Sequence, residues 1–124
     1  MTETELLNLI SLGEDSILEL KDLIFKNNKI TGPHRDSIAD EMSAMANSYG
    51  GTIILGVNDK THEITGIETS NINTAENWIK DIANDLISPP LDCKITKHCL
   101  ILNTDNNKNI LRIDVTNSST KCNK

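Results

Sequence analysis

The chain has 124 residues, which is enough for one ordinary domain and too few for two domains with separate cores. Its twelve Lys and Arg residues against eighteen Asp and Glu residues give a net charge of −6. This charge argues against a uniformly basic nucleic-acid-binding module and against a polybasic membrane-surface protein. Aromatic residues make up 2% of the chain, so a sheet that stacks RNA bases on several aromatic side chains is disfavoured.

The amino-terminal sequence and the cysteines indicate where the protein resides. The segment after Met1 is acidic, unlike the positive start of a secretory signal peptide. No apolar run approaches the length of a membrane span. The three cysteines are an odd number, which fits a reducing compartment better than a disulfide framework. We therefore expect a cytoplasmic protein without a membrane partner.

The first half of the chain predicts two helices with a strand between them. Thr2 and Glu5 have the spacing of a capping box, which predicts a helix over residues 3–12. Leu18 and Leu20 alternate with Glu19 and Lys21, the period of a half-buried strand, which we expect to extend to Phe25. A helix that begins near Pro33 and ends at Gly50 is predicted from one apolar stripe: Ile38, Met42, Met45 and Tyr49.

The second half predicts four strands and one helix. Residues 52–57 are apolar and β-branched, which is typical of a strand buried on both faces, and residues 63–67 are expected to return as a hairpin arm. A helix capped by Asn73 or Thr74 is indicated by a long apolar stripe: Ala75, Trp78, Ile79, Ile82, Ala83, Leu86 and Ile87. Two further strands are expected over residues 93–102 and 110–115, joined by a turn at 105–108.

The predicted element order is α-β-α-β-β-α-β-β, which indicates the α/β class: a single layered domain with a mixed β-sheet and about three helices. We expect this domain to occupy residues 1–115. Residues 116–124 are expected to be a polar tail, where a longer chain has been truncated.

Acidic residues stand near two of the predicted strands. Glu14 precedes the first strand, Glu19 lies on its polar face, and Asp59 follows the buried strand. Three converging carboxylates would suit a divalent cation such as Mg²⁺ or Mn²⁺, which prefers oxygen ligands and activates water for hydrolysis. Acidic residues in turns are more often simply solvated, so the spacing alone leaves both interpretations open.

Four segments in order carry a resemblance to a known family. They are Glu14-x-x-x-x-Glu19-Leu-Lys21, Met45-Ala-Asn-Ser-Tyr-Gly-Gly51, Thr52-Ile-Ile-Leu-Gly-Val-Asn-Asp59 and Ile64-Thr-Gly66-Ile67. Together they resemble the AlbA-like domain of the Schlafen family, closely over residues 12–67 and by element order up to residue 115. Leu20 and Met45 stand where the family usually has Phe, and Asn58 stands where it usually has Asp.

The resemblance implies an α/β domain associated with nucleic acids, described in bacteria and archaea as a DNA-binding domain of regulators and in animals as an RNA-cleaving core. It implies that Glu14, Glu19 and Asp59 are the catalytic and metal-binding acids. Residues that would hold backbone phosphate are Lys21, Lys26, Lys29 and Arg35. Because animal members join two such lobes, cleavage by this chain would need a homodimer or a missing C-terminal domain.

These observations leave three functions open. The leading hypothesis is a nucleic-acid-binding and processing domain, a metal-dependent endoribonuclease that acts on structured RNA with Mg²⁺ or Mn²⁺. The first alternative is a non-catalytic DNA-binding module of a transcriptional regulator. The second is a protein-interaction domain, because the acidic surface disfavours polyanions.

Overall fold

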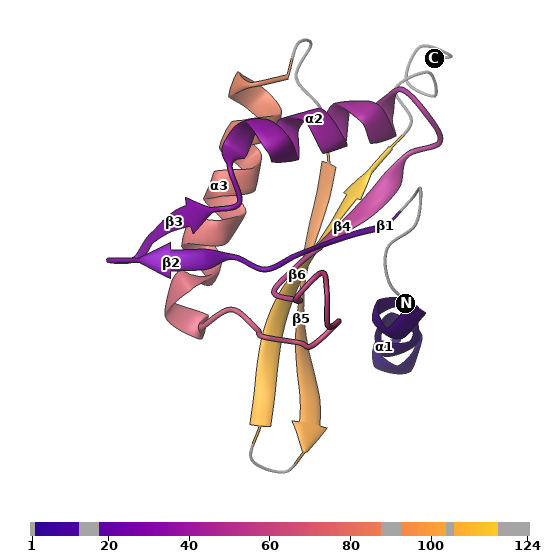
Figure 1. Ribbon diagram of the computed structural model, residues 1–124, viewed down its shortest axis with the longest axis vertical. Coiled ribbons are helices and arrows are strands. Elements are labelled where there is room, and N and C mark those ends of the chain that lie inside the picture. Colours follow the sequence, from indigo (N-terminus) through magenta and orange to yellow (C-terminus); the bar gives the residue numbers. More distant parts are fainter. Residues whose placement is uncertain (1, 13–17, 88–92, 104–105, 117–124) are drawn as a thin grey trace.

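The computed structural model describes residues 2–12, 18–87, 93–103 and 106–116, and it describes side chains in all of these except 101–103 and 106–107. Within these residues, three α-helices and six strands follow one another (Figure 1). The elements in order are α1 (Glu3–Leu12), β1 (Leu18–Lys21), β2 (Ile24–Lys26), β3 (Lys29–Gly32), α2 (Arg35–Ala46), β4 (Gly51–Leu55), a 3₁₀ turn η1 (Thr69–Asn71), α3 (Ile72–Asp85), β5 (Cys93–Asn103) and β6 (Asn106–Val115).

The main sheet has four strands in the order β1-β4-β6-β5. Strand β1 is parallel to β4, with Glu19 opposite Ile53, whereas β4–β6 and β5–β6 are antiparallel. The sheet is therefore mixed, and the expected α/β class with about three helices is confirmed. Strand β4 has neighbours on both sides and three consecutive fully buried residues, Ile53, Ile54 and Leu55, as its β-branched sequence predicts.

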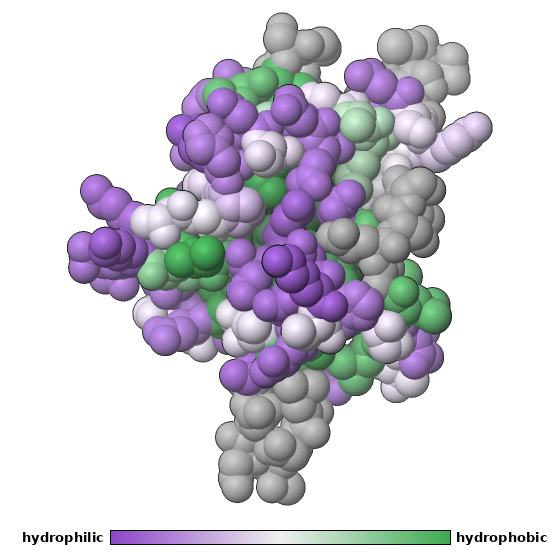
Figure 2. Space-filling model, in the orientation of Figure 1, coloured by the Kyte–Doolittle hydropathy of each residue, from purple (hydrophilic) through white to green (hydrophobic). Residues whose placement is uncertain are grey.

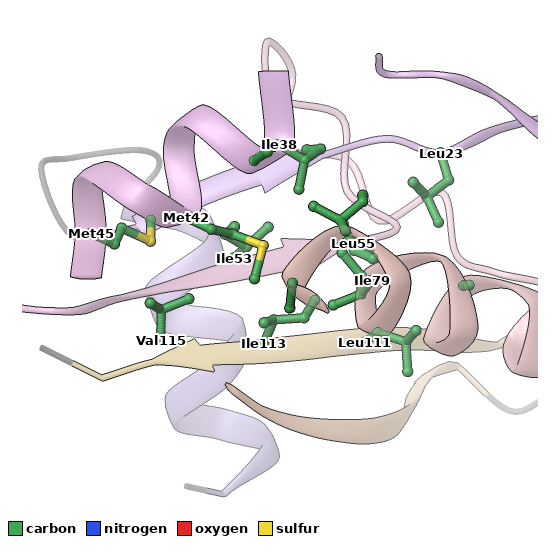
Figure 3. Close-up of a cluster of buried hydrophobic side chains, with 14 of the residues drawn as sticks. Leu23, Ile38, Met42, Met45, Ile53, Leu55, Ile79, Leu111, Ile113 and Val115 are labelled. Atoms are coloured by element: carbon green, nitrogen blue, oxygen red, sulfur yellow. The ribbon is translucent and has the colours of Figure 1, made fainter. Parts of the chain in front are cut away.

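Helices cover both faces of this sheet. On one face, α2 and α3 pack on alternate residues of β4 and β6, and Figure 3 shows Met42 of α2 and Ile79 of α3 meeting Ile53 of β4 and Ile113 of β6. On the other face, α1 places Leu6 against the second set of alternate residues. Because successive residues of a strand point to opposite faces, the buried residues of these strands divide between two hydrophobic clusters, one on each face of the sheet.

Helix α1 has the predicted bounds and the predicted cap. The Glu5 N–H donates to Thr2 Oγ1 at 3.1 Å, and the Thr2 N–H donates to Glu5 Oε1 at 3.2 Å. These reciprocal bonds satisfy donors that the first turn of a helix leaves without partners. Hydrogen bonds from the Thr2 backbone and side chain also lower the pKa of the Glu5 carboxyl, because its charged form accepts them.

Helix α2 ends earlier than expected, which corrects the prediction for Tyr49. The helix stops at Ala46, and the N–H groups of Ser48 and Gly50 both donate to the Met45 carbonyl. Gly50 adopts a left-handed backbone with φ of +81°, the usual conformation just past a helix end. Ile38, Met42 and Met45 are buried as predicted, but Tyr49 lies beyond the helix and is 90% exposed.

Residues 24–32 form a hairpin that the sequence interpretation did not foresee, since it treated Phe25 as the end of β1. Asn27 and Asn28 have φ of +54° and +63°, and Lys26 pairs directly with Lys29. Two central residues with positive φ define the two-residue turn that fits the twist of antiparallel strands. The result is a separate two-stranded sheet beside α3 (Figure 1).

The hairpin arm expected at residues 63–67 forms only in part: the chain returns antiparallel, with one bridge between Val57 and Ile64 and a hydrogen bond from the Asn58 N–H to the Glu63 carbonyl. The N–H groups of Thr65 and Gly66 both turn back to the Gly56 carbonyl, and the Ile67 N–H donates to the Asn109 carbonyl. The chain therefore crosses to β6 instead of continuing beside β4.

Two boundaries also move. Strand β6 begins at Asn106 instead of residue 110, so residues 106–108 of the predicted turn belong to the strand. Helix α3 begins at Ile72, with Asn71 instead of Asn73 or Thr74 at its N-cap position. The polar residues 106–109 form a strand because β5 supplies their backbone hydrogen bonds, whatever their side chains.

Candidate nucleic-acid interface

One cluster of charged side chains lies where β1 passes beneath α2. Glu19 and Lys21 point to the same side of β1, opposite to the buried Leu18 and Leu20. The Lys21 ammonium is 2.9 Å from Glu41 Oε2 on α2 and 4.0 Å from Glu19 Oε2. Glu19 and Glu41 line the same hollow of about 260 Å³. Lys21, expected to hold phosphate, therefore already has two carboxylates beside it.

Asp59 belongs to a tight turn after β4. The Asn58 side-chain oxygen accepts the backbone N–H groups of Lys60 at 2.8 Å and Thr61 at 3.0 Å. Asn58 thus closes the turn, in the manner of an Asx motif. The Asp59 side chain is exposed. The last residue of β1 lies next to the start of this turn, because the Gly56 and Val57 N–H groups both donate to the Lys21 carbonyl.

The predicted set of three metal-binding acids is only partly described. Glu14 lies outside the described residues, so its place beside Glu19 and Asp59 stays a prediction. Among the described residues no three His, Cys, Asp or Glu side chains come together as a metal-binding group. The described carboxylates therefore do not by themselves fit Mg²⁺ or Mn²⁺, because the ammonium of Lys21 lies beside both Glu19 and Glu41.

The other three predicted phosphate ligands gather elsewhere, around the β2–β3 hairpin. Lys26 and Lys29 are cross-strand partners at its tip, and both are exposed. Arg35, also exposed, is the first residue of α2, three positions after β3 ends. Hydrophilic residues gather at the protruding tip of the hairpin, at the left of Figure 2, with less hydrophilic residues directly beside them. The structure therefore separates Lys21 from the cations that are open to solvent.

A groove runs between this hairpin and α3, and we call it the hairpin–helix groove. It has a volume of about 430 Å³. Residues that line it include Lys29, Arg35, Thr74, Asn77, Trp78 and Asp81. Thr74, Asn77, Trp78 and Asp81 recur every three or four residues, so they share one face of α3. Two of the predicted phosphate ligands thus face a tryptophan across a groove.

Glu41 and Trp78 are the residues of interest that the sequence reasoning did not assign to a site. Glu41 Oε1 is buried and has no hydrogen-bond partner among the described residues. No signal in the sequence singles out Glu41, because its relation to Glu19 depends on how α2 lies over β1. Trp78 was interpreted only as part of a core-facing stripe. It is the one tryptophan of the chain. Its position four residues after the polar Thr74 places the two side chains on the same side of the helix, and this spacing was the signal in the sequence for a position of Trp78 at the margin of the core.

A second polar group lies on the same face of the sheet as α1, on strands β4, β5 and β6. Asp114 accepts hydrogen bonds from Thr52 Oγ1 at 3.0 Å and Arg112 Nε at 3.1 Å. His98 is on the neighbouring strand, and its Nε2 is buried without a hydrogen-bond partner among the described residues. Burial and the nearby Arg112 lower the pKa of His98, and Asp114 opposes this in part.

Fold and sites together define a small α/β domain with an acidic hollow at its edge strand and a separate cation-lined groove. The family model described as Schlafen, AlbA_2 matches residues 14–124. The chain therefore belongs to the Schlafen AlbA_2 family, which points to a function related to nucleic acids. No curated protein matches the chain. In the described part of the chain, no helix is long and apolar enough to cross a membrane.

Proposed function

We propose that this domain binds nucleic acid through the cations of the β2–β3 hairpin and the start of α2. The observation that supports this most directly is that Lys29 and Arg35 line one groove, with Lys26 paired to Lys29 at its edge. Phosphate contacts need exposed cations at neighbouring positions, even in a protein whose net charge is negative. Lys21 contributes less, because it is held against Glu41.

Salt dependence tests this proposal. Three phosphate contacts predict a slope of log K against log salt of about −2 for single strands and about −3 for duplex DNA. The variant Lys26→Gln/Lys29→Gln/Arg35→Gln should lose most of the affinity and most of the slope. The matched control is Lys60→Gln/Lys94→Gln/Lys97→Gln, which removes the same charge from exposed residues outside the groove. Equal affinities for the two triple variants would contradict the proposal.

A second proposal concerns phosphodiester hydrolysis at Glu19, which the resemblance assigns to a set with Glu14 and Asp59. Its support is the position of Glu19, fixed on a strand of the main sheet and facing a hollow that it shares with Glu41. Carboxylates on rigid strands are well placed for general base chemistry. The resemblance adds Mg²⁺ or Mn²⁺, which Glu14 and Asp59 would have to hold together with Glu19, because the described carboxylates alone do not fit such an ion. The chemistry that the ion would supply there is activation of the attacking water.

The test is cleavage of transfer RNA in the presence of Mn²⁺ by the wild type, by Glu19→Gln, and by Glu14→Ala/Glu19→Ala. Cleavage that both variants lose supports hydrolysis at this site. No cleavage by the wild type, or equal cleavage by the variants, favours the non-catalytic DNA-binding module. If neither RNA nor DNA binds at low salt, the protein-interaction hypothesis takes precedence. Sedimentation of the same samples tests the expected homodimer.

A further inference from the structure

The hairpin–helix groove combines a flat aromatic ring with cations. Trp78 of α3 packs partly against the core that α2 and α3 share with the sheet, and it is half-buried rather than enclosed. The part of the indole that the core does not cover lines the groove. An indole in this position offers a surface on which another flat ring can stack, and such stacking does not depend on which base is present.

The polar groups around the indole are of two kinds. Lys29 and Arg35 approach from the hairpin side and from α2, and they carry positive charge. Asn77 and Asp81 are exposed, and they flank Trp78 on α3. Asn77 can donate and accept hydrogen bonds, and the Asp81 carboxylate accepts them from amino or imino groups. A ligand with an anionic end and a flat ring bearing N–H groups matches this lining.

The size of the groove agrees with such a ligand. A volume of about 430 Å³ lies within the roughly 300–1,000 Å³ of small-molecule sites in proteins. A nucleotide carries a flat ring, a hydrogen-bonding edge and a phosphate, the three kinds of group that this lining can contact. In a duplex, both faces of each base are covered by neighbouring bases, so only an unpaired base can reach an indole.

Resting on the proposed function, we propose that the hairpin–helix groove takes an unpaired nucleotide of a single strand. The base stacks on Trp78, and its phosphates lie against Lys29 and Arg35. Asn77 and Asp81 contact the edge of the base. The domain thereby prefers single-stranded regions to a duplex, although it has a single tryptophan and no array of aromatic side chains.

The wild-type protein tests this directly, because Trp78 is the only tryptophan and its fluorescence reports on the groove. The chain is titrated with a short single-stranded oligonucleotide, with the matched duplex, and with a nucleoside monophosphate. We expect saturable quenching by the single strand and little by the duplex. The monophosphate should bind more weakly, because it makes fewer phosphate contacts. Quenching by the monophosphate at equal affinity would overturn the assignment to a strand.

Two variants extend the test. Trp78→Leu keeps an apolar side chain for the core and should weaken single-strand binding about 5- to 150-fold, the range for loss of a base–aromatic stack. Asn77→Ala changes an exposed residue and should weaken binding without affecting the fold. Its matched control is Asn84→Ala, exposed on the same helix and outside the groove. If Trp78→Leu does not fold, the wild-type titration and Asn77→Ala decide the question.

The outcomes separate this inference from the proposed function. Single-strand binding that leaves Trp78 fluorescence unchanged, and that Asn77→Ala does not weaken, overturns the inference but leaves cation-based binding intact. Equal quenching by duplex and single strand also overturns it. Binding that survives in Lys26→Gln/Lys29→Gln/Arg35→Gln contradicts the proposed function itself.

Discussion

Replacing Lys21 with methionine removes the positive charge between two carboxylates and keeps most of the side-chain stem. The ammonium lies 2.9 Å from Glu41 Oε2 and 4.0 Å from Glu19 Oε2. Without it, two acidic groups that line one hollow face each other with no cation between them. We therefore expect Lys21→Met to lower the free energy of unfolding.

The size of the expected loss in the free energy of unfolding depends on how exposed the three charged side chains are. Lys21, Glu41 and Glu19 are 20%, 24% and 27% exposed, so they are neither surface groups nor fully buried ones. Exposed ion pairs contribute about 0.2–1 kcal/mol, whereas breaking a buried pair costs about 3–5 kcal/mol. An intermediate loss of about 1–3 kcal/mol follows. In a domain of this size it corresponds to a decrease in Tm of about 3–12 °C.

Urea unfolding of the wild type, of Lys21→Met and of Lys94→Met measures this loss. Lys94 is an exposed strand residue on β5, so its substitution should change stability by less than about 0.5 kcal/mol. A double-mutant cycle with Glu41→Gln then isolates the Lys21–Glu41 pair. Because neutral glutamine leaves less charge uncompensated, we expect the double variant to lose less stability than the two single variants together.

The reasoning is refuted if Lys21→Met is as stable as Lys94→Met. It is also refuted if the losses of Lys21→Met and Glu41→Gln simply add, since additivity would mean that the two side chains do not interact in solution. Either result would also remove the reason given for the small contribution of Lys21 to phosphate binding.

Two further predictions concern other parts of the fold. Met42 is fully buried on the inner face of α2, so Met42→Ala should cost about 2–5 kcal/mol in urea unfolding, while the similarly sized Met42→Leu should cost less than about 1.5 kcal/mol. Equal losses would contradict the close packing in Figure 3. Burial and Arg112 lower the pKa of His98 in the folded state. As pH falls below about 6.5, the unfolded chain therefore binds a proton at His98 before the folded chain does. The free energy of unfolding is full above that pH and decreases progressively below it. Unfolding at about pH 8 and about pH 5 should therefore show a larger decrease for the wild type than for His98→Gln, and parallel decreases would show that His98 carries no such penalty.

Local patterns determined much of the fold. The Thr2–Glu5 cap, the apolar stripe of α3 and the β-branched run of β4 each encode their structure within a few residues, because capping bonds and side-chain periodicity are short-range properties. The β2–β3 hairpin was also encoded locally, by the positive φ that Asn27 and Asn28 can adopt, but no prediction was drawn from this pair. The arm expected at residues 63–67 stops after one bridge at Ile64, and this could not be foreseen, since the Ile67 N–H leaves β4 for a backbone partner on β6.

For the sites, the sequence by itself identified which residues carry charge, and the tertiary structure decided what each charge faces. Lys21 and Lys29 are the same residue type on short strands, yet Lys21 lies against a glutamate of α2 and Lys29 opens onto a groove beside Trp78. Glu41 follows Glu19 by twenty-two positions in the sequence, and the two line one hollow only because α2 packs next to β1. Contacts of this kind come from the packing of whole elements on the sheet, and no short window of sequence records how two elements lie against each other.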